Sequence, residues 1–479
     1  MVYRNELLYI HPGFLNAKIE HMKKTVTLLS LSAFFPLTGL MAQTTTMQIG
    51  ATTVNVDTAY TGLTVPWEIQ YGSDGHLWVS ERSGIISRIH PTNHTKTVIL
   101  DISSSVYLSY ESGLLGFALH PNFPTTPEIF LSYVYNASNP KQKIVKYTYN
   151  GTNLVNETVL IDNIDAGDTH CGARFAFLAD GTLLVTTGDD HGPTYPQDPN
   201  RLHGKILRLN TDGSVPANNP TPGSYVYTLG HRNPQGLLVM DNGTIYISEH
   251  GNTTDDEFQI VEAGRNYGWP NVEGFCDTPT EQTFCNANNV KEPIVAWTPT
   301  IATSDIIYYE NPQFPEWDQR ILMTVLKDKR IIAMQLNGAG DAVTNQSPYL
   351  INSFGRLRDI CVGPNKEIYI ATNGQNWGNT DSNHSIIIIY PPGSLTGIEE
   401  HSNDMSVSPN PFNEQLTVSL NQQDARGLLQ MSDLSGRVLL TTPVSQNNLT
   451  VETAHLPKGL YLLSLIQDGK VTSMQKILK

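Results

Sequence analysis

One short pattern returns four times along the chain: a turn containing Asp or Asn, followed by a run of alternating apolar residues. The copies cover Ser73–Gly84, Ala179–Gly188, Asp241–Gly251 and Pro364–Gly374. Each copy is typical of a hairpin turn that leads into a half-buried strand. Irregularly spaced copies of one hairpin are typical of propeller blades separated by insertions, so the pattern predicts a β-propeller.

A β-sandwich is the alternative for such hairpins, but a sandwich domain usually has about 100 residues. The hairpins belong to a much longer segment, residues 50–392, which shows no clear helical pattern. Only 16% of the residues are charged, whereas Gly (37) and Tyr (21) are plentiful, as in turn-rich β proteins. We therefore expect an all-β protein with a propeller over residues 50–392.

The N-terminus has the features of a secretory signal peptide. Two lysines precede an apolar stretch at residues 26–40, and Leu40-Met41-Ala42 resembles a cleavage site before Gln43. We interpret residues 1–42 as a signal peptide that starts at Met22, with residues 1–21 as a spurious upstream extension. The apolar stretch is short and interrupted by Pro and Gly, so we expect no stable membrane span.

The formal net charge of the chain is −15. Such a charge argues against nucleic acid or an anionic membrane as a partner. If a small anionic ligand binds, a local group of Arg and Lys side chains must override the overall negative field.

Four cysteines are present, and an exported protein can form disulfides. Cys276 and Cys285 flank a short loop and are the expected pair. Cys171 and Cys361 have no obvious partner. The spacing of the four contains no C-x-x-C pair that would suggest zinc.

Composition changes after residue 392. A polar linker, residues 393–404, separates the propeller from a C-terminal segment, residues 405–479, in which short apolar strands alternate with turns. Strands are predicted at 416–420, 428–433, 436–440 and 459–465, as in a small β-sandwich. A carbohydrate-binding sandwich is one interpretation, but no cluster of exposed aromatic residues offers a sugar platform.

The C-terminal segment resembles the sorting domain that Bacteroidetes use for type IX secretion. The resemblance is carried by Pro409–Phe412, Asp433–Arg437, Leu456–Tyr461 and Lys476–Lys479. It implies export through the periplasm to the cell surface or the medium, with the type IX secretion machinery as a partner.

Six further motifs stand in order within the predicted propeller. They are Val65–Trp67, Glu111–Phe123, His170–Arg174, Gly230–Gly236, Asp255–Glu257 with Asn266–Pro270, and Gly355–Asp359. In this order they resemble the soluble glucose/sorbosone dehydrogenases, which are six-bladed quinoprotein propellers. The resemblance implies pyrroloquinoline quinone and Ca²⁺ as cofactors, oxidation of an aldose at C1 to the lactone, and an external electron acceptor.

Arg356 and Arg358 are expected on one face of a strand, because side chains alternate along a strand. Two adjacent guanidiniums repel each other unless an anion lies between them, and Lys327 adds a third cation. A ligand with several carboxylates would suit them. The alternative is surface pairing with Asp328 and Asp359. The resemblance implies that all three cations grip the quinone cofactor.

The resemblance also places Arg232, Asn233 and Glu111 against the cofactor. For Arg232 and Asn233 the alternative is a purely structural turn, since Asn often caps its own backbone. Glu111 stands where the family usually has Gln. A carboxylate beside an anionic cofactor is unfavourable unless it is protonated or metal-bound.

His170 matches the catalytic histidine of the family. Oxidation of a sugar hydroxyl needs a base, and imidazole titrates close to neutral pH. The family usually has Asp directly before this histidine, but here Thr169 precedes it and Asp168 stands one residue further back. Cys171 is a weak candidate nucleophile, because adjacent residues of a strand point to opposite faces.

Calcium has two predicted sites. Gly251 and Asn252 match family positions whose backbone carbonyls bind the catalytic ion, although the family commonly has Pro at the second position. Glu257, Tyr267 and Asp277 suggest a second, structural ion. For the acidic run 255–257 alone, a solvated turn would be the better interpretation.

Two other functions remain open at this point. Six-bladed propellers also serve as calcium-dependent lactonases, and a propeller can lose its cofactor and become a non-catalytic binding protein. The cations Lys327, Arg356 and Arg358 argue against the lactonase, which has no polyanionic cofactor to hold. The departures at Glu111 and Thr169 keep the binding protein open. We expect a six-bladed β-propeller dehydrogenase followed by a small β-sandwich.

Overall fold

The computed structural model describes residues 45–192, 194–376, 384–391, 405–420, 426–433, 438–467 and 470–479. The predicted signal peptide, residues 1–42, and the predicted linker, residues 393–404, lie outside the described residues.

Six antiparallel sheets follow one another along the chain up to Tyr390. Five of them are four-stranded blades whose strands pair in chain order. They are β3 (Pro66–Tyr71), β4 (Leu77–Glu81), β5 (Ile85–Ile89) and β6 (Lys96–Asp101); β7 (Leu114–Leu119), β8 (Glu128–Tyr135), β9 (Lys141–Tyr149) and β10 (Leu154–Asp165); β11 (Phe175–Phe177), β12 (Leu183–Thr187), β13 (Lys205–Leu209) and β14 (Val226–Leu229); β15 (Pro234–Val239), β16 (Ile245–Glu249), β17 (Asp256–Val261) and β18 (Val295–Trp297); and β19 (Thr303–Tyr309), β20 (Arg320–Val325), β21 (Arg330–Leu336) and β22 (Val343–Tyr349).

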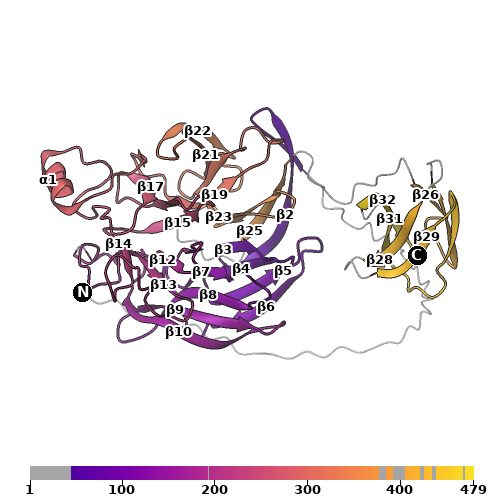
Figure 1. Cartoon of the computed structure of the whole chain (residues 1–479), viewed down its shortest axis with the longest axis horizontal. Helices are drawn as coiled ribbons and strands as arrows, with labels where there is room; N and C mark the ends of the chain where they lie inside the picture. Colours follow the sequence, from indigo (N-terminus) through magenta and orange to yellow (C-terminus); the bar gives the residue numbers. More distant parts are fainter. Residues whose placement is uncertain are drawn as a thin grey trace, which may run out of the picture. The chain divides into compact units, whose positions relative to one another are not determined.

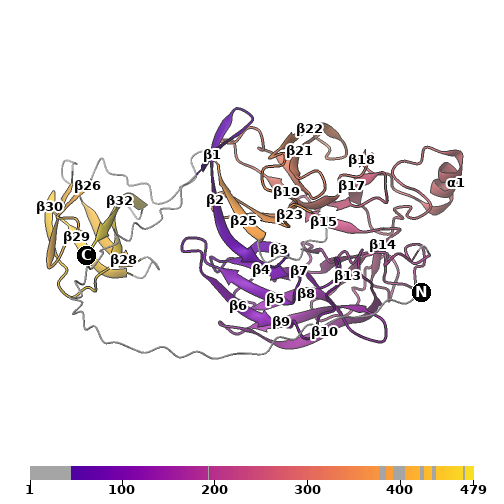
Figure 2. The same cartoon turned by 180° about the vertical axis from the view of Figure 1, so that it is seen from behind.

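The sixth sheet closes the ring. It contains β23 (Leu357–Val362), β24 (Ile368–Thr372) and β25 (His384–Tyr390), followed by β2 (Thr52–Leu63) and β1 (Thr45–Ile49) from the other end of the propeller. Strand β2, indigo in Figures 1 and 2, lies beside orange β25, with Asn55 opposite Tyr390. The first strand of each blade contacts that of the next, and β23 contacts β3. The predicted six-bladed propeller is therefore confirmed.

The repeated turn pattern lies at one position of the blade. In all four copies it joins the first strand to the second, which is β4, β12, β16 or β24. Gly75, Gly181 and Gly243 take φ values of +76°, +81° and +85° in open space, so the left-handed backbone alone requires glycine there. In the fourth copy Lys366 takes this conformation with φ of +66°.

Second strands are almost entirely buried, because they lie between neighbouring blades. Every residue of β4, β12 and β16 is buried. Between the first two blades, for example, Trp78 packs with Phe117, Phe123 and Ile129. The core is thus a series of apolar layers between blades, which leaves the loops at the rims free to form a site.

One helix stands among the described residues: α1, Pro279–Asn288, in the connection between β17 and β18. No helix was predicted here. Thr278 caps it and forms a capping box with Glu281. None of its residues is buried, and the predicted disulfide between Cys276 and Cys285 ties it to the preceding loop. Cys171 and Cys361 are free.

The C-terminal unit has two sheets. One contains β26 (Met405–Ser408), β27 (Gln415–Leu420) and β30 (Asn448–Glu452); the other contains β29 (Val438–Val444), β28 (Gly427–Asp433), β31 (Leu460–Gln467) and β32 (Lys470–Leu478). Their buried side chains, among them Phe412, Val418 and Leu463, form one core of their own. The predicted small β unit is confirmed.

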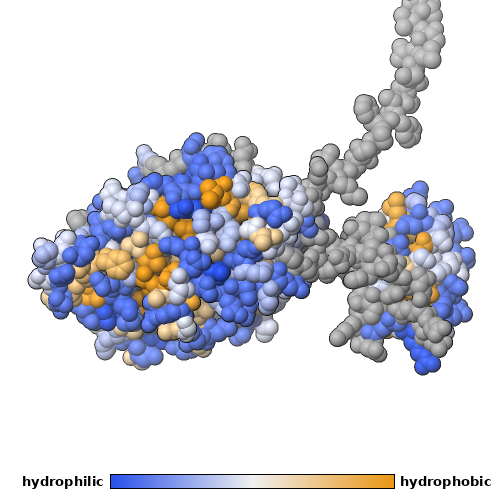
Figure 3. Space-filling model, turned by 90° about the horizontal axis from the view of Figure 1, so that it is seen from above, coloured by the Kyte–Doolittle hydropathy of each residue, from blue (hydrophilic) through white to orange (hydrophobic). Residues whose placement is uncertain are grey.

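On the face shown in Figure 3, the described residues are largely hydrophilic with several apolar patches. Exposed large apolar side chains are dispersed over different strands, such as Val98 in β6 and Val159 in β10. In the part of the chain that the structure describes, no helix has the length and apolar character needed to cross a membrane.

Candidate active site

Three buried guanidiniums form what we call the arginine cluster: Arg82 after β4, Arg356 before β23, and Arg358 in β23. They are 6%, 8% and 5% exposed. Burial lowers the pKa of all three, that of Arg358 to about 9, while the Glu111 carboxylate acts in the opposite direction on each. The two arginines predicted from the sequence do lie near each other, and Arg82 joins them from another blade.

The cluster has too few acceptors for its donors. Arg358 donates from Nε to Asn373 Oδ1 (3.0 Å) and from Nη1 to Gln235 Oε1 (2.8 Å), and it lies 4.1 Å from the ring centre of Trp67. Within the described chain, the side chains of Arg82 and Arg356 have no hydrogen-bond or ion-pair partner, and Arg82 Nε is fully buried. Unpaired buried cations are costly, so this arrangement suits an anionic ligand.

Surface pairing does not explain these arginines. Asp328 pairs with Arg330 at 2.9 Å, and Asp359 pairs with Arg174. Lys327 is exposed, and its Nζ donates to Thr300 O (2.8 Å). The described structure gives no contact between Lys327 and the arginine cluster, so its predicted role stays a prediction.

The turn that carries Arg232 and Asn233 is held by a residue that we did not predict. Glu249, at the end of β16, accepts from the backbone N–H groups of Arg232 and Asn233 (3.2 Å for Asn233) and bonds His231 Nδ1 at 2.9 Å. Arg232 lies over Trp269 at 5.3 Å. Arg232 Nε and Asn233 Nδ2 are buried without partners. The turn is therefore structurally fixed and still presents free donors.

His170 is oriented by Asp189. The distance from His170 Nδ1 to Asp189 Oδ1 is 2.7 Å, and Trp269 Nε1 donates to Asp189 Oδ2 at 2.8 Å. Burial would raise the pKa of Asp189, but the hydrogen bonds from His170, from the His191 N–H and from Trp269 hold it below its usual value. An ionised Asp189 accepts the Nδ1 proton, which leaves Nε2 as the nitrogen that can act as a base.

The residues before His170 do not orient it. Asp168 Oδ1 accepts from the Tyr107 hydroxyl at 2.7 Å, and Thr169 Oγ1 bonds to His191 Nε2. The sequence comparison with the family had drawn attention to these two residues and missed Asp189. The signal was present, since Asp189 directly follows the predicted hairpin copy that ends at Gly188.

His191 was also missed. Its ring centre lies 4.0 Å from that of His170, with 36° between the planes. Asp190 and His191 have φ values of +48° and +56°, and His170 has +57°. Such a cluster of left-handed residues is unfavourable unless packing enforces it, and it is typical of functional sites. Gly188 permits the close approach, because a Cβ there would lie 1.8 Å from the His170 carbonyl oxygen.

An open pocket of about 520 Å³ adjoins the histidines. Its lining residues are Tyr110, Glu111, Gly167, Asp168, Thr169, His170, Asp190 and His191. Glu111 Oε2 accepts from the His170 N–H at 3.4 Å. Glu111 thus belongs both to this pocket and to the surroundings of the arginine cluster. Cys171 is buried, and burial raises the pKa of its thiol, which makes it a poor nucleophile.

The structure brings only some of the predicted calcium-binding residues together. Gly251, Glu257 and Tyr267 line one small enclosed cavity together with Arg232 and Glu249. Asn252 and Asp277 are exposed and do not line it. Among the described residues, no group of three or more His, Cys, Asp or Glu side chains is arranged to hold a metal ion. A calcium ion here would depend on backbone carbonyls.

The acidic run is not a solvated turn. Asp256 is buried; its Oδ1 accepts from the Gly251 N–H at 2.8 Å and its Oδ2 from the Ile301 N–H at 2.7 Å. Glu257 is also buried, and burial together with the charge of Glu249 raises its pKa well above the usual value. Two neighbouring buried carboxyl groups favour a cation or a shared proton.

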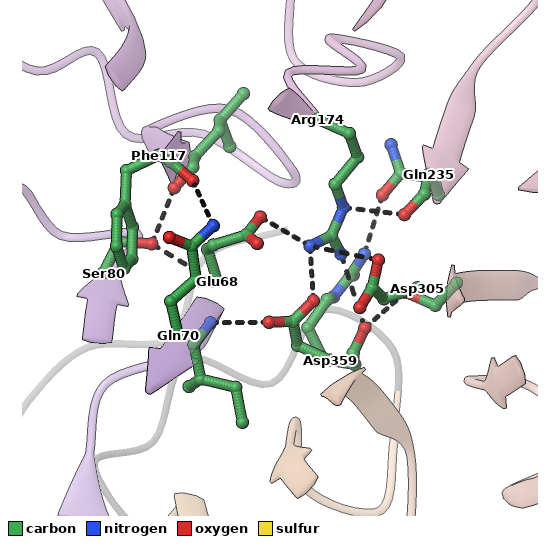
Figure 4. A network of polar contacts seen from close by, with 12 residues as sticks. Glu68, Gln70, Ser80, Phe117, Arg174, Gln235, Asp305 and Asp359 are labelled. Atoms are coloured by element: carbon green, nitrogen blue, oxygen red, sulfur yellow. Dashed lines mark hydrogen bonds and ion pairs between the residues drawn. The ribbon is translucent and has the colours of Figure 1, made fainter. Parts of the chain in front are cut away.

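A second charged group, the carboxylate network, joins four blades around Arg174 (Figure 4). Arg174 Nη1 lies 2.7 Å from Glu68 Oε2 and 4.0 Å from Asp305 Oδ1, and it also pairs with Asp359. Burial raises the pKa of all three acids. Arg174 Nε donates to the Gln235 carbonyl at 2.7 Å. The last residue of the His170–Arg174 motif therefore ties the blades together.

Comparison with known proteins decides the family. Residues 63–379 match the model for glucose/sorbosone dehydrogenases, and residues 406–479 match the secretion system C-terminal sorting domain. The chain belongs to the glucose/sorbosone dehydrogenase family. It carries in addition a sorting domain of the type IX secretion system, which directs secretion or attachment to the surface.

Characterised members of the glucose/sorbosone dehydrogenase family are distant but similar over nearly their whole length. Aldose sugar dehydrogenase YliI of Escherichia coli is 28% identical over 71% of this chain and 95% of its own. Quinoprotein glucose dehydrogenase B of Acinetobacter calcoaceticus is 27% identical over 70% of this chain and 88% of its own. The PQQ-bound aldose sugar dehydrogenase structure from Streptomyces coelicolor is 29% identical, with a TM-score of 0.59 over 70% of this chain and 98% of its own. These relatives support oxidation of a sugar.

Proposed function

We propose that this protein oxidises an aldose at C1 to the lactone, with pyrroloquinoline quinone as the hydride acceptor and Ca²⁺ as a second cofactor. The observation that supports this best is the arginine cluster: buried guanidiniums, two of them without side-chain partners among the described residues, near Glu111, which also lines the pocket of the oriented His170. The cluster argues against the lactonase, which would leave these cations unpaired.

The donors fit a ligand with several carboxylates and carbonyls. Among the described residues, the Arg356 guanidinium has no side-chain partner, and Arg232 Nε and Asn233 Nδ2 are buried donors without acceptors. Arg358 already uses two of its donors in hydrogen bonds within the protein. We therefore propose that it contributes less to cofactor binding than Arg356 does. When bound, the quinone supplies a hydride acceptor and Ca²⁺ supplies a Lewis acid.

The protein's own chemistry is proton removal. His170 Nε2 takes the proton of the C1 hydroxyl as the hydride leaves C1. Asp189 holds the ring through Nδ1 and stabilises the imidazolium that forms, as an orienting carboxylate does in other acid–base pairs. Trp269 holds the other oxygen of Asp189, which prevents the carboxylate from turning away.

We propose the catalytic calcium site at the backbone carbonyls of Gly251 and Asn252. Asp256 fixes the Gly251 amide and, through the Ile301 N–H, the segment that precedes β19. The second calcium would lie with Glu257 and Tyr267 in the enclosed cavity. Asp277 is too exposed to belong to that cavity as it stands.

The electrons would then pass to an external acceptor outside the cell, since the sorting domain directs the protein to the surface or the medium. Of the alternatives, the non-catalytic binding propeller is the one that the test below separates from the dehydrogenase.

The test combines purified protein with the quinone, Ca²⁺ and a panel of aldoses, and follows dye reduction. We expect reduction that needs all three additions and the loss of quinone binding when a chelator removes calcium. His170→Ala should lower turnover by about 10²- to 10⁴-fold with nearly unchanged quinone affinity. Quinone binding without turnover on any sugar would favour the binding propeller, and lactone hydrolysis without quinone would favour the lactonase.

A further inference from the structure

Glu111 lies where the arginine cluster meets the His170 pocket. Its backbone N–H donates to the Asp168 carbonyl at 2.8 Å, and its Oε2 accepts from the His170 N–H at 3.4 Å. The residue lines the open pocket with both histidines. The loop segment that pairs with Asp168 therefore fixes the backbone of Glu111, and the His170 N–H orients its carboxylate.

The charges around Glu111 do not balance. Arg82 packs against the loop that carries Glu111, because the Leu114 N–H donates to the Arg82 carbonyl at 3.0 Å and a Cβ on Gly113 would lie 2.5 Å from Arg82 Cγ. The Glu111 carboxylate is also the acid that raises the pKa of Arg82, Arg356 and Arg358 against the effect of burial. Three buried guanidiniums thus share one acid. Because the side chains of Arg82 and Arg356 also lack hydrogen-bond partners in the described chain, the cluster has room for further negative charge and for further acceptors.

An incoming polycarboxylate would compete with Glu111 for the same guanidiniums. The ligand's negative charges would also repel the Glu111 carboxylate at close range, in surroundings where burial strengthens the repulsion. The least costly outcome is that Glu111 loses its charge by taking a proton from solvent. The carboxylic acid can then stay in place as a hydrogen-bonding neighbour of the ligand.

We propose that Glu111 is the counter-ion of the ligand-free arginine cluster, and that it takes up one proton when a polycarboxylate binds to Arg82, Arg356 and Arg358. The proposal assigns Arg82 as an additional ligand-binding residue. It rests on the proposed function in one respect: the ligand is the quinone cofactor, a tricarboxylate.

Other titratable groups face Glu111, and the test must separate them. They are Arg232, His250, His191, His170 and Cys171, with Asp168 on the loop that Glu111 contacts. Histidines could also take up protons when an anion binds. Only the part of the proton uptake that disappears with the Glu111 carboxylate belongs to Glu111.

Linkage gives the sign of the effect. If ligand binding takes up a proton, the affinity rises as pH falls through the range in which Glu111 titrates. In that range the dissociation constant should change roughly tenfold per pH unit. A carboxylate that kept its charge would give no such slope.

The experiment is a calorimetric titration of pyrroloquinoline quinone into the purified, calcium-loaded protein, in two buffers with different heats of ionisation. The difference in heat gives the number of protons taken up per quinone bound. We expect close to one for the wild type at the pH where the slope is steepest. Glu111→Gln should remove that uptake and tighten binding at about pH 8 by roughly 10- to 100-fold.

Asp168→Asn is the matched control, because Asp168 lines the same pocket but its charge does not act on the three arginines. It should behave like the wild type. Arg82→Gln should weaken binding at least tenfold, whereas Arg330→Gln, in a surface pair, should not.

Wild-type binding without proton uptake overturns the proposal, as does a Glu111→Gln variant that binds no more tightly than Asp168→Asn. If Glu111→Gln does not fold, the wild-type proton count decides alone. If the wild type binds no quinone at any pH, the proposed function fails instead. Citrate then serves as the probe: its binding should still take up a proton and should raise the Tm of Glu111→Gln more than that of Asp168→Asn.

Discussion

The carboxylate network surrounds one guanidinium with three acids, whereas in the arginine cluster three buried guanidiniums are stabilised by the charge of one acid, Glu111. In the network, Glu68 and Asp359 both pair with Arg174, and burial raises the pKa of all three acids, so that protons can replace missing cations. In the cluster, Arg82 and Arg356 have no such remedy, because a guanidinium does not lose its proton in proteins.

The difference teaches how to separate structural charge from functional charge in one propeller. Excess acid can be neutralised from within by protonation, so a buried acidic group can serve the fold alone. Excess guanidinium can be neutralised only by a partner, and an unpaired buried arginine therefore indicates a ligand.

Arg174→Met should break the network with the largest effect. The change leaves three buried acids without the guanidinium that they share, and breaking a buried pair in this way costs about 3–5 kcal/mol. The free energy of unfolding from denaturant titration measures it. Arg330→Met, in an exposed pair, should cost at most about 1 kcal/mol. Equal losses in the two variants would mean that the network does not hold the blades together.

Arg356→Met should leave stability almost unchanged and weaken quinone binding. Its guanidinium has no protein partner to lose in the described chain, so the free energy of unfolding should change by less than about 1 kcal/mol or increase. Quinone affinity should fall by roughly 30- to several-thousand-fold, because a charge partner of the ligand is lost in a desolvated site. A large loss of stability with unchanged quinone affinity would show that Arg356 is structural.

Asp305→Asn should change how the free energy of unfolding depends on pH. The pKa of Asp305 is raised in the folded protein. Its contribution to stability is therefore present at low pH and is lost as pH rises through the folded-state value. The amide cannot ionise, so the variant should lose less stability than the wild type as pH rises above the ordinary Asp pKa of about 4, by about 1 kcal/mol or more. Unfolding free energies measured across this range check it, and identical slopes for the two proteins would contradict it.

Truncation after Pro392 should have the smallest effect on both charge groups. The described residues of the C-terminal unit form a core of their own, which runs from Met405 to Ile477. The purified propeller should therefore keep its unfolding transition and its quinone affinity within about twofold. In the native host the truncated protein should not reach the surface, which cell fractionation would show. Normal surface display would contradict the role of the sorting domain.

The fold was predictable where the signal is local. The turn positions at Gly75, Gly181 and Gly243 mark the first hairpin of their blades, because a left-handed turn residue leaves its trace in the sequence. The pairing of β2 with β25 left no such trace, since it joins strands at opposite ends of the propeller. The helix α1 had a readable signal in its capping box, Thr278 and Glu281, which the search for alternating strands passed over.

The site was predictable where a motif carries it within one loop. Arg356, Arg358, His170 and the Arg232–Asn233 turn stand in such motifs. The residues that complete the site, Asp189, Glu249 and Arg82, come from the ends of second strands or the loops that follow them. Their roles depend on which loops meet at the rim, and only the closed ring of blades decides that.

The shared sheet of β2 and β25 also sets an order in time. A chain that emerges N-terminus first can form its early blades, but β2 pairs with β1 alone until residues 384–390 appear. Strands that lie far apart in the sequence pair slowly, because the long intervening loop must first close. We therefore expect β2 and β25 to pair late in folding and so to close the ring. The sorting domain follows β25 in the sequence. The export signal is therefore complete only on a chain that already contains every strand of the ring.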